Sequence, residues 1–575
     1  MNAKDIIRDE FDYIDKKGFD EYDIATILCS SIQENEKKFF ENSSEWLAFQ
    51  LSEGVDNEWG TYYGPFLVNI DGTCTPPKEM ITKDVLNYWE NRIEEVTNPI
   101  LKARYSGLLV DFKHNCGVKI RTIHIKSIID IITGNYLKYQ TIGVHKIKRA
   151  LRLAFESKNK SIIDEVKQVM SLYEDMMANN NNIGICGQIF LLMFDNINHF
   201  TQQEISEYVN RLEERLNNLT VKDIDEKFNP YIIEDIVVIL AQYYNKYNDK
   251  VKLQRVLDIL FDSYIKVAKH FSAIQKHMHW NRLYTIFTKY QYNEMANHIL
   301  VELQNSSKNI LEEMSTFEMP IEIPQEQFNQ YIKEMTSGSK EEVFRKFILE
   351  YIPNKEESKE QMLKISKNSP LMALCPTQLY DYKGRPSSII GNIENDIEGN
   401  LALHISQSLN FRAFFIHTII KENINKGYFS IKSIIEFLHN CPLFEKDRYI
   451  IIEKGIDAYF KDDYLIMMHL LIPQIENAIR NIVELSGSTS LKRNRQSFNG
   501  FQLMTFDELL RDNAVSNIGG SDDFSYYLRL LFTDQKGWNL RNSICHGLAP
   551  ISLFNTMTAD RVFHSLLCVG SIRTK

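Results

Sequence analysis

The chain has 575 residues, of which 44% are hydrophobic and 25% charged, so it is long enough for several domains and too apolar to be disordered throughout. The formal net charge is −10, but the segment from Cys441 to Lys575 carries 15 basic and 15 acidic residues, which places the whole imbalance in residues 1–440. This composition excludes a protein that coats nucleic acid through a broad basic face. Any nucleic acid must be held by a local basic pocket, by a second subunit, or only briefly.

Apolar residues recur with helical spacing through the first 315 residues, and short polar joints separate the helical segments. Pro99 suits the first turn of a helix that Thr97 or Asn98 would cap. Successive helices of this length predict an α-hairpin or solenoid-like array in residues 1–315. The predicted helices are Lys83–Val96, Pro99–Phe112, Val144–Ser157, Ser161–Met177, Gln203–Leu216, Tyr231–Tyr247 and Lys252–Lys269.

Cysteine usage and hydropathy indicate a reducing, aqueous compartment. The eight cysteines are spread singly without a CxxC pair, and we find no signal-peptide pattern, so we expect reduced thiols and a cytoplasmic protein. The longest apolar run, from Ile183 to Phe194, contains Gln188 and is far shorter than the roughly 20 residues of a membrane span. It predicts a buried helix and no contact with a membrane.

Two stretches break the helical pattern. Glycine and proline within Tyr62–Pro77 predict an irregular loop, with a short strand at Phe66–Val68. Farther along, Thr377–Tyr382 and Arg385–Ile390 flank Lys383-Gly384, and this arrangement predicts a β-hairpin near residues 377–390.

Prolines and a polar turn mark the expected domain boundaries. Pro320 and Pro324 bracket a linker before a helix at Gln325–Thr336, and Asn440-Cys441-Pro442 marks a second boundary. We therefore expect a helical linker domain in residues 316–440 and a separate domain in residues 441–575.

Residues 441–575 have the pattern of a compact helical bundle. A polar loop is expected from Ser486 to Asn499, and Thr505 and Glu508 have the spacing of a capping box. The expected helices are Glu445–Phe460, Tyr464–Leu485, Asp522–Phe532, Trp538–His546 and Ala559–Ser571. The whole chain is thus predicted to be all-α, with a helical array followed by a helical bundle.

The segment that ends at His546 carries two helical patterns. Leu540, Ile544 and Leu548 recur every four residues and are expected to face the core. Asn542 and His546 are also four residues apart, so they would share a different face of the same helix.

This segment resembles a known family. Arg541-Asn542-Ser543-Ile544-Cys545-His546-Gly547 is similar to the R-polar-x3–4-H signature of HEPN ribonucleases, and the string from Gly537 to Leu548 resembles the HEPN branch named for its RNxxxHG motif. The segments His469–Arg480 and Phe506–Asp512 resemble other parts of that branch, so the resemblance covers about the last quarter of the chain. Trp89–Asp111 resembles the N-terminal helical region of the same proteins. A bare RxxxxH is common by chance, whereas these ordered segments together are not.

The resemblance implies metal-independent RNA cleavage at a site assembled between two HEPN-type domains of a homodimer. His546 would act as acid or base, because only histidine has an unperturbed pKa near cellular pH. Arg541 would stabilise the pentacoordinate phosphate through planar, bidentate donors, and Asn542 would orient His546 or a phosphate oxygen. The expected product is a 2′,3′-cyclic phosphate.

Other residues are supporting candidates. Glu476 and Arg480 are four residues apart on the preceding helix, and they either brace the motif, with Glu476 pairing to Arg541, or form an ordinary surface ion pair. Basic side chains near the motif either grip the RNA backbone or are solvated surface. These basic residues are Lys492, Arg493, Arg495 and Lys536.

No metal or cofactor is expected. His277-Met278-His279 would splay its two histidines on a helix, and the sequence contains no Walker motif or dinucleotide fingerprint.

The preferred hypothesis is a toxin-like endoribonuclease of anti-phage defence or stress response. It acts on RNA as a homodimer, and a regulatory or trigger protein is a further partner. The alternative is a non-catalytic helical scaffold whose HEPN-type domain serves dimerisation or RNA binding, since HEPN domains also include inactive binding modules.

Overall fold

The computed structural model describes residues 2–32, 39–54, 57, 59–69, 72–177, 187–220, 229–315, 322–494 and 500–573, and the chain is predominantly helical. It divides into two compact units. The first comprises Met1–Phe271 and Asn281–Ile299, and the second comprises Ser272–Trp280 and Leu300–Lys575. Helices α13 (Ala273–Lys289) and α14 (Asn293–Ser307) have residues in both. None of the helices within the described ranges combines the length and the apolar character of a membrane span.

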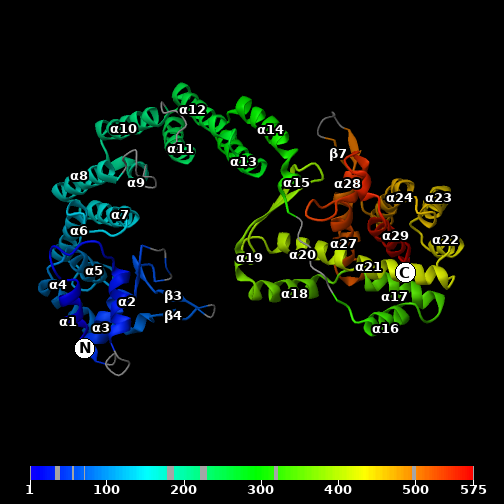
Figure 1. The fold of residues 1–575 in the computed structure, drawn as a ribbon, viewed down its shortest axis with the longest axis horizontal. Helices are drawn as coiled ribbons and strands as arrows, with labels where there is room; N and C mark the ends of the chain where they lie inside the picture. Colours follow the sequence, from blue (N-terminus) through cyan, green and yellow to red (C-terminus); the bar gives the residue numbers. More distant parts are fainter. Residues whose placement is uncertain are drawn as a thin grey trace. The chain divides into compact units, whose positions relative to one another are not determined.

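In the first unit most helices pack against the helix that follows them in the chain (Figure 1). Asn98 caps α5 and Pro99 occupies its first turn, as predicted. Two short antiparallel strand pairs interrupt the helices, and β3 confirms the expected short strand. The elements are α1 (Ala3–Glu10), α2 (Glu21–Ser31), α3 (Phe40–Gln50), β1 (Ser52–Glu53), β2 (Tyr63–Gly64), β3 (Leu67–Val68), β4 (Cys74–Thr75), α4 (Lys83–Glu95), α5 (Pro99–Asp111), α6 (Val118–Thr133), α7 (Gln140–Ser157), α8 (Lys160–Met177), α9 (Gln188–Asp195), α10 (Gln202–Thr220), α11 (Pro230–Lys246) and α12 (Lys250–Ala268).

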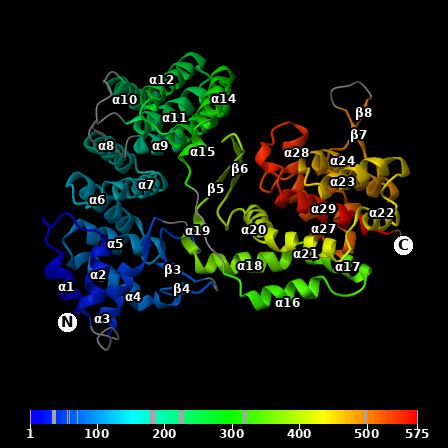
Figure 2. The same ribbon diagram turned by 45° about the vertical axis from the view of Figure 1, so that its right-hand side comes forward.

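The second unit is a helical bundle with two β-hairpins (Figure 2). The hairpin expected near residues 377–390 is confirmed. The elements are α15 (Ile310–Glu313), α16 (Gln325–Met335), α17 (Lys340–Glu350), α18 (Lys355–Asn368), α19 (Pro370–Leu374), β5 (Thr377–Tyr380), β6 (Pro386–Ile390), α20 (Ile397–Phe411), α21 (Ala413–Asn425), α22 (Ile431–His439), α23 (Tyr449–Phe460), α24 (Tyr464–Leu485), β7 (Leu491–Arg493), β8 (Phe501–Leu503), α25 (Phe506–Leu510), α26 (Asn513–Ser516), α27 (Asp523–Phe532), α28 (Leu540–Cys545) and α29 (Thr556–Gly570).

The polar loop expected from Ser486 to Asn499 is partly wrong. Leu491–Arg493 forms strand β7, which pairs antiparallel with β8 and places Lys492 opposite Gln502. The second strand lies beyond the predicted loop, so the loop sequence alone did not contain the pairing partner. The capping box at the start of α25 is confirmed, because Thr505 and Glu508 exchange both capping hydrogen bonds.

The boundary expected near Asn440 does not separate two cores. One hydrophobic core runs from Met335 to Val569, so residues 316–440 and 441–575 do not form separate domains. Cys441 is buried, and its thiol lies 3.5 Å from the carbonyl oxygen of Val569. The segment at Asn440–Pro442 is therefore a turn that packs on the last helix, where the sequence had predicted a domain boundary.

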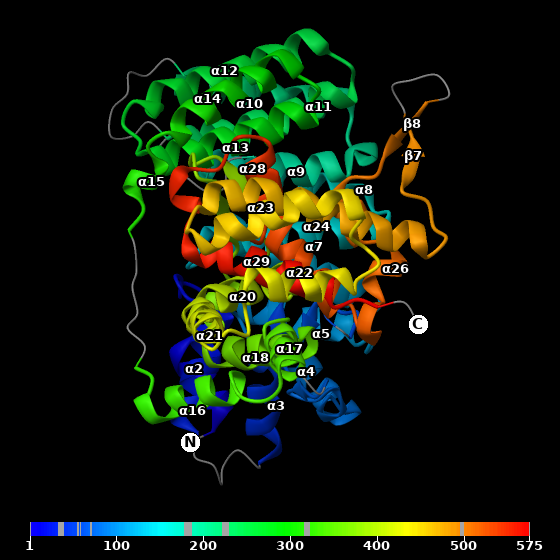
Figure 3. The ribbon, with the colours of Figure 1, turned by 90° about the vertical axis from the view of Figure 1, so that its right-hand side faces the viewer.

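Helix α29 is the centre of the second unit (Figure 3). It packs against α24, α22, α21 and α17, and its side chains are buried from Thr558 onward. Its His564 has the core position expected of a histidine in an apolar helix. Since the Ile348 carbonyl, 3.2 Å from Nε2, can only accept, Nε2 carries the proton and Nδ1 accepts from the Tyr527 hydroxyl at 2.9 Å. Burial lowers the pKa of His564 to about 3, and the nearby Arg561 adds to this effect.

This pKa predicts acid-sensitive stability. Below about pH 6.5, the usual pKa of histidine, the imidazole of His564 is protonated in the unfolded chain but stays neutral in the folded protein. The free energy of unfolding therefore falls as the pH drops from about 6.5 toward the pKa of the folded state. We expect His564 to contribute a loss of about 2 kcal/mol in the free energy of unfolding between pH 7 and pH 5. Urea unfolding of wild type and His564→Gln at both pH values checks this. The variant should be less stable at pH 7 and less sensitive to pH, and equal pH dependence would contradict the prediction.

Candidate functional site

The motif helix α28 is short and well anchored. It spans only Leu540–Cys545 and packs against α24 and α27. Leu540 and Ile544 are buried as predicted, but Leu548 is 38% exposed, so its expected place in the core is wrong. The helix ends before Leu548, and the helical spacing therefore no longer applies to that residue.

His546 lies one residue beyond the helix and not in its last turn. It is the C-cap residue, its backbone N–H donates to the Asn542 carbonyl at 3.1 Å, and its side chain is exposed. Gly547 follows with a φ of +65°, the left-handed conformation with which many helices end. The imidazole is thus presented to solvent at the end of the motif.

Arg541 is fixed by Glu476 on helix α24. Its Nε donates to Glu476 Oε2 at 2.9 Å and its Nη2 to Glu476 Oε1 at 3.4 Å. Arg480, one turn later on α24, donates to the same carboxylate at 3.4 Å and to the Met504 carbonyl at 3.3 Å. The expected pairing of Glu476 with Arg541 is present, and it is largely shielded from solvent, with Arg541 24% and Glu476 17% exposed.

Asn542 contacts Arg541 and not His546 through its side chain. Its Oδ1 accepts from Arg541 Nη1 at 3.3 Å, and its Nδ2 donates to Asn539 Oδ1 at 2.8 Å and to the Thr533 carbonyl at 3.3 Å. No hydrogen bond or ion pair joins Arg541 to His546 within the described residues of one chain. The structure therefore brings together Arg541, Asn542, Glu476 and Arg480 and leaves His546 apart.

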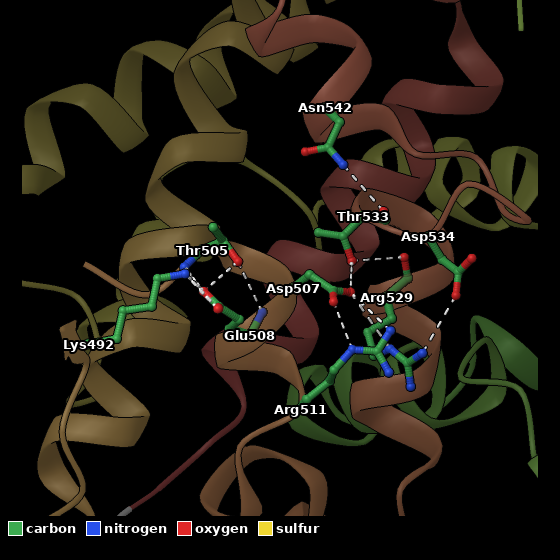
Figure 4. Close-up of polar contacts among 9 residues, drawn as sticks. All are labelled: Lys492, Thr505, Asp507, Glu508, Arg511, Arg529, Thr533, Asp534 and Asn542. Carbon is green, nitrogen blue, oxygen red and sulfur yellow. Dashed lines mark hydrogen bonds and ion pairs between the residues drawn. The ribbon is translucent and has the colours of Figure 1, made fainter. Parts of the chain in front are cut away.

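A polar cluster between α25 and α27 supports the asparagine (Figure 4). Asp507 accepts from Arg511 Nε at 2.7 Å and from the Thr533 hydroxyl at 2.9 Å, and Arg529 pairs with Asp534 at 3.5 Å. Burial raises the pKa of Asp507, but the hydrogen bonds from Arg511 and Thr533 outweigh it and hold the pKa below its usual value. Thr533 thus links the two groups: its hydroxyl donates to the Asp507 carboxylate, and its carbonyl accepts from the motif asparagine.

The basic hairpin is partly neutralised. Lys492 donates to both carboxylate oxygens of Glu508 at 2.6 Å (Figure 4). These hydrogen bonds, together with that from the Thr505 backbone, lower the pKa of Glu508 to about 2. Lys492 therefore offers less charge to a phosphate than the sequence suggested.

The other basic candidates are separate from the motif. Arg493 is exposed on the same strand, Arg495 lies outside the described residues, and Lys536 is half-buried in the loop before α28. No hydrogen bond in the described ranges joins Arg493 or Lys536 to Arg541 or Asn542.

Sequence reasoning missed Asn539 and Thr533, the two partners of the motif asparagine. Asn539 has a φ of +51°, a conformation that asparagine tolerates better than most residues, and its place before the motif was a usable signal. Thr533 follows α27, and nothing in the sequence connects it to residue 542. The i, i+4 pair of Asp507 and Arg511 was legible, but its contact with Thr533 was not.

Comparisons of the chain with protein-family models, with curated proteins and with solved structures find no match. In the parts of the chain that the structure describes, no group of three or more His, Cys, Asp or Glu side chains is placed to hold a metal ion.

The contact between Glu476 and Arg541 predicts a measurable loss of stability. In Glu476→Gln, two guanidinium groups lose a carboxylate that is mostly shielded, and hydrogen bonds to charged groups contribute about 1.5–3 kcal/mol. We expect the free energy of unfolding to fall by about 1–3 kcal/mol in urea titrations. Glu453→Gln, at an exposed position on α23, is the matched control and should change it by less than about 0.5 kcal/mol. Equal effects of the two substitutions would show that the Glu476 pair does not brace the motif.

Proposed function

We propose that the protein is a metal-independent endoribonuclease of the HEPN type. The proposal rests on the resemblance of Gly537–Leu548 to that family. The observation that carries it is the arrangement of the motif: an anchored Arg541 lies on a short helix, and the solvent-exposed His546 is the residue that follows this helix.

The guanidinium keeps donors for a phosphate. The contacts with Glu476 and Asn542 use three of its five N–H groups, so two remain to donate to anionic oxygens. Because a carboxylate fixes its orientation, the guanidinium is positioned before the substrate arrives, and preorganised donors are effective in stabilising a transition state.

A second copy of the chain completes the site in this proposal. The Arg541 side chain is directed toward Glu476 on α24, whereas the exposed His546 lies beyond the end of α28 and forms no hydrogen bond with Arg541 among the described residues. One chain therefore does not readily direct both groups to one phosphate. Two copies related by a dyad would supply two histidines and two arginines, so that the arginine of one chain could face the histidine of the other.

The reaction follows from these groups. One His546 removes the proton of the 2′-hydroxyl, and the 2′-oxygen attacks phosphorus. The bond from phosphorus to the 5′-oxygen breaks, and the second His546 protonates that oxygen. Arg541 stabilises the extra negative charge of the pentacoordinate phosphate. The products are a 2′,3′-cyclic phosphate and a 5′-hydroxyl.

By analogy with the family, we place this activity in a toxin-like effector of anti-phage defence or stress response, with the first unit as sensor or scaffold. The second candidate function is a non-catalytic scaffold with an HEPN-type dimerisation or RNA-binding domain. The neutralisation of Arg541 by Glu476 favours it, because a paired guanidinium can serve as a brace alone.

Loss of the imidazole should abolish cleavage. We expect purified His546→Ala to cut RNA at least about 100-fold more slowly than wild type, since positioned acid–base catalysis contributes roughly 10²–10⁴-fold. His439→Ala removes another exposed histidine of the second unit and should leave cleavage unchanged. Gel analysis of labelled RNA and end-group analysis for the cyclic phosphate provide the measurement. If wild type and His546→Ala are equally inactive on RNA and equally harmless on overexpression, with the natural trigger supplied, the enzyme assignment fails.

Charge alone should not replace the guanidinium. Arg541→Lys keeps the positive charge but loses the planar fork, so we expect cleavage to fall by more than tenfold.

Cleavage by wild type should persist in EDTA, because the proposed steps use only side chains. A strict requirement for a divalent cation would contradict the mechanism.

A further inference from the structure

A cavity lies beside the motif helix. It has a volume of about 530 Å³ and is lined by the turn of the β5–β6 hairpin and by the chain leading into α28. This volume lies within the range of about 300–1,000 Å³ typical of small-molecule sites. Among its lining residues are Tyr382, Lys383, Trp538, Asn539, Asn542 and Ser543.

The hairpin turn is held by hydrogen bonds and packing of its own. Asp381 Oδ1 accepts from the backbone N–H groups of Lys383 and Arg385 at 2.8 and 2.9 Å. Gly384 has a φ of +73°, and a Cβ at this position would lie 2.2 Å from the Ser307 carbonyl oxygen, so the turn is packed against backbone. A site built on this turn loses little conformational freedom on binding.

One positive charge of the cavity is not neutralised. Arg385 is paired, because it donates to Asp381 Oδ2 at 2.7 Å. Burial raises the pKa of Asp381, but the hydrogen bonds from Arg385 outweigh this effect, and the pKa lies below its usual value. Lys383 is exposed and forms no ion pair with any residue in the described ranges. The cavity therefore favours an anionic ligand.

The remaining lining groups suit a nucleobase. Tyr382 is 47% exposed and is one of the residues that line the cavity. Trp538 also lines the cavity, and its indole N–H donates to the Ser406 carbonyl at 3.4 Å. Bases stack on such aromatic rings, and the Asn539 amide and the Ser543 hydroxyl supply hydrogen bonds to a base edge.

The cavity adjoins the motif arginine. Asn542 lines the cavity and accepts from Arg541 Nη1 at 3.3 Å. A ligand in the cavity would therefore be separated from the guanidinium by a single side chain.

We propose that this cavity binds one nucleoside phosphate unit, with its base against Tyr382 and its phosphate on Lys383. This inference rests on the proposed ribonuclease function: the bound unit is a nucleotide of the RNA strand, and this nucleotide flanks the scissile phosphate at Arg541. The cavity would then determine which base is tolerated beside the cut. A free nucleotide has the same chemistry, and the experiment distinguishes the two sources.

Binding to the full-length His546→Ala chain tests the site. Fluorescence anisotropy with labelled ten-nucleotide homopolymers of each base measures strand binding, and calorimetry with the four nucleoside monophosphates measures free-nucleotide binding. We expect Tyr382→Ala to weaken binding at least about tenfold, since stacking contributes about 1–3 kcal/mol per base and 1.4 kcal/mol is tenfold. Lys383→Gln should weaken it severalfold and lower the salt dependence by about one charge.

Two matched variants serve as controls. Tyr382→Phe keeps the ring, and Lys364→Gln removes an exposed charge on α18, so both should bind within about twofold of the parent. Strand binding that depends on Tyr382 and Lys383 supports an RNA segment, and monophosphate binding that depends on them supports a free nucleotide. Unchanged binding in Tyr382→Ala and Lys383→Gln, or no binding of either ligand, would overturn the site.

Failure of the site and failure of the proposed function give different results. If Tyr382→Ala and Lys383→Gln cut RNA as fast as wild type and with the same base preference, only the nucleotide site is overturned. If the chain binds a nucleotide through Tyr382 but cuts no RNA, only the proposed ribonuclease function is overturned.

Discussion

Helix α29 is buried over most of its length, so its polar side chains need partners inside the second unit. Asp560 accepts hydrogen bonds from residues of α23 and α21, Arg561 donates to a carbonyl of α20, and His564 bonds to α27 and α17. Apolar contacts tolerate rotation, whereas hydrogen bonds fix direction. These hydrogen bonds therefore fix the directions of five helices around α29. The motif helix packs against one of them, α27, and against α24, which itself packs on α29.

The motif helix depends on this surrounding structure. A helix of six residues is not stable alone, because nucleation costs more than so few hydrogen bonds return. Burial of Leu540 and Ile544 holds one side, and the Glu476 carboxylate on α24 holds Arg541 on another. A long helix buried on one face is a rigid support, so the guanidinium is positioned by tertiary contacts and not by its own segment.

Positive charge near the motif is partly paired. Arg541, Lys492 and Arg385 each contact a carboxylate, and Lys383 and Arg493 form no ion pair within the described residues. This pairing agrees with the neutral composition of residues 441–575 and with the absence of a broad basic face in the sequence. If the protein acts on RNA, attraction to the strand must therefore be local, and a second copy would double the few free charges.

The sequence by itself determined the helical character, the positions of about half of the helices, the capping of α5 and α25 and the β5–β6 hairpin, because these depend on local spacing and local hydrogen bonds. It also indicated the pairing of Glu476 with Arg541, since both belong to segments of one resemblance. Only the tertiary structure decided that residues 316–440 share a core with the last segment, that Asn542 reaches Thr533, and that a cavity adjoins Arg541. Those features join residues that are distant in sequence or set apart by a turn, and no local periodicity records which distant surfaces will meet.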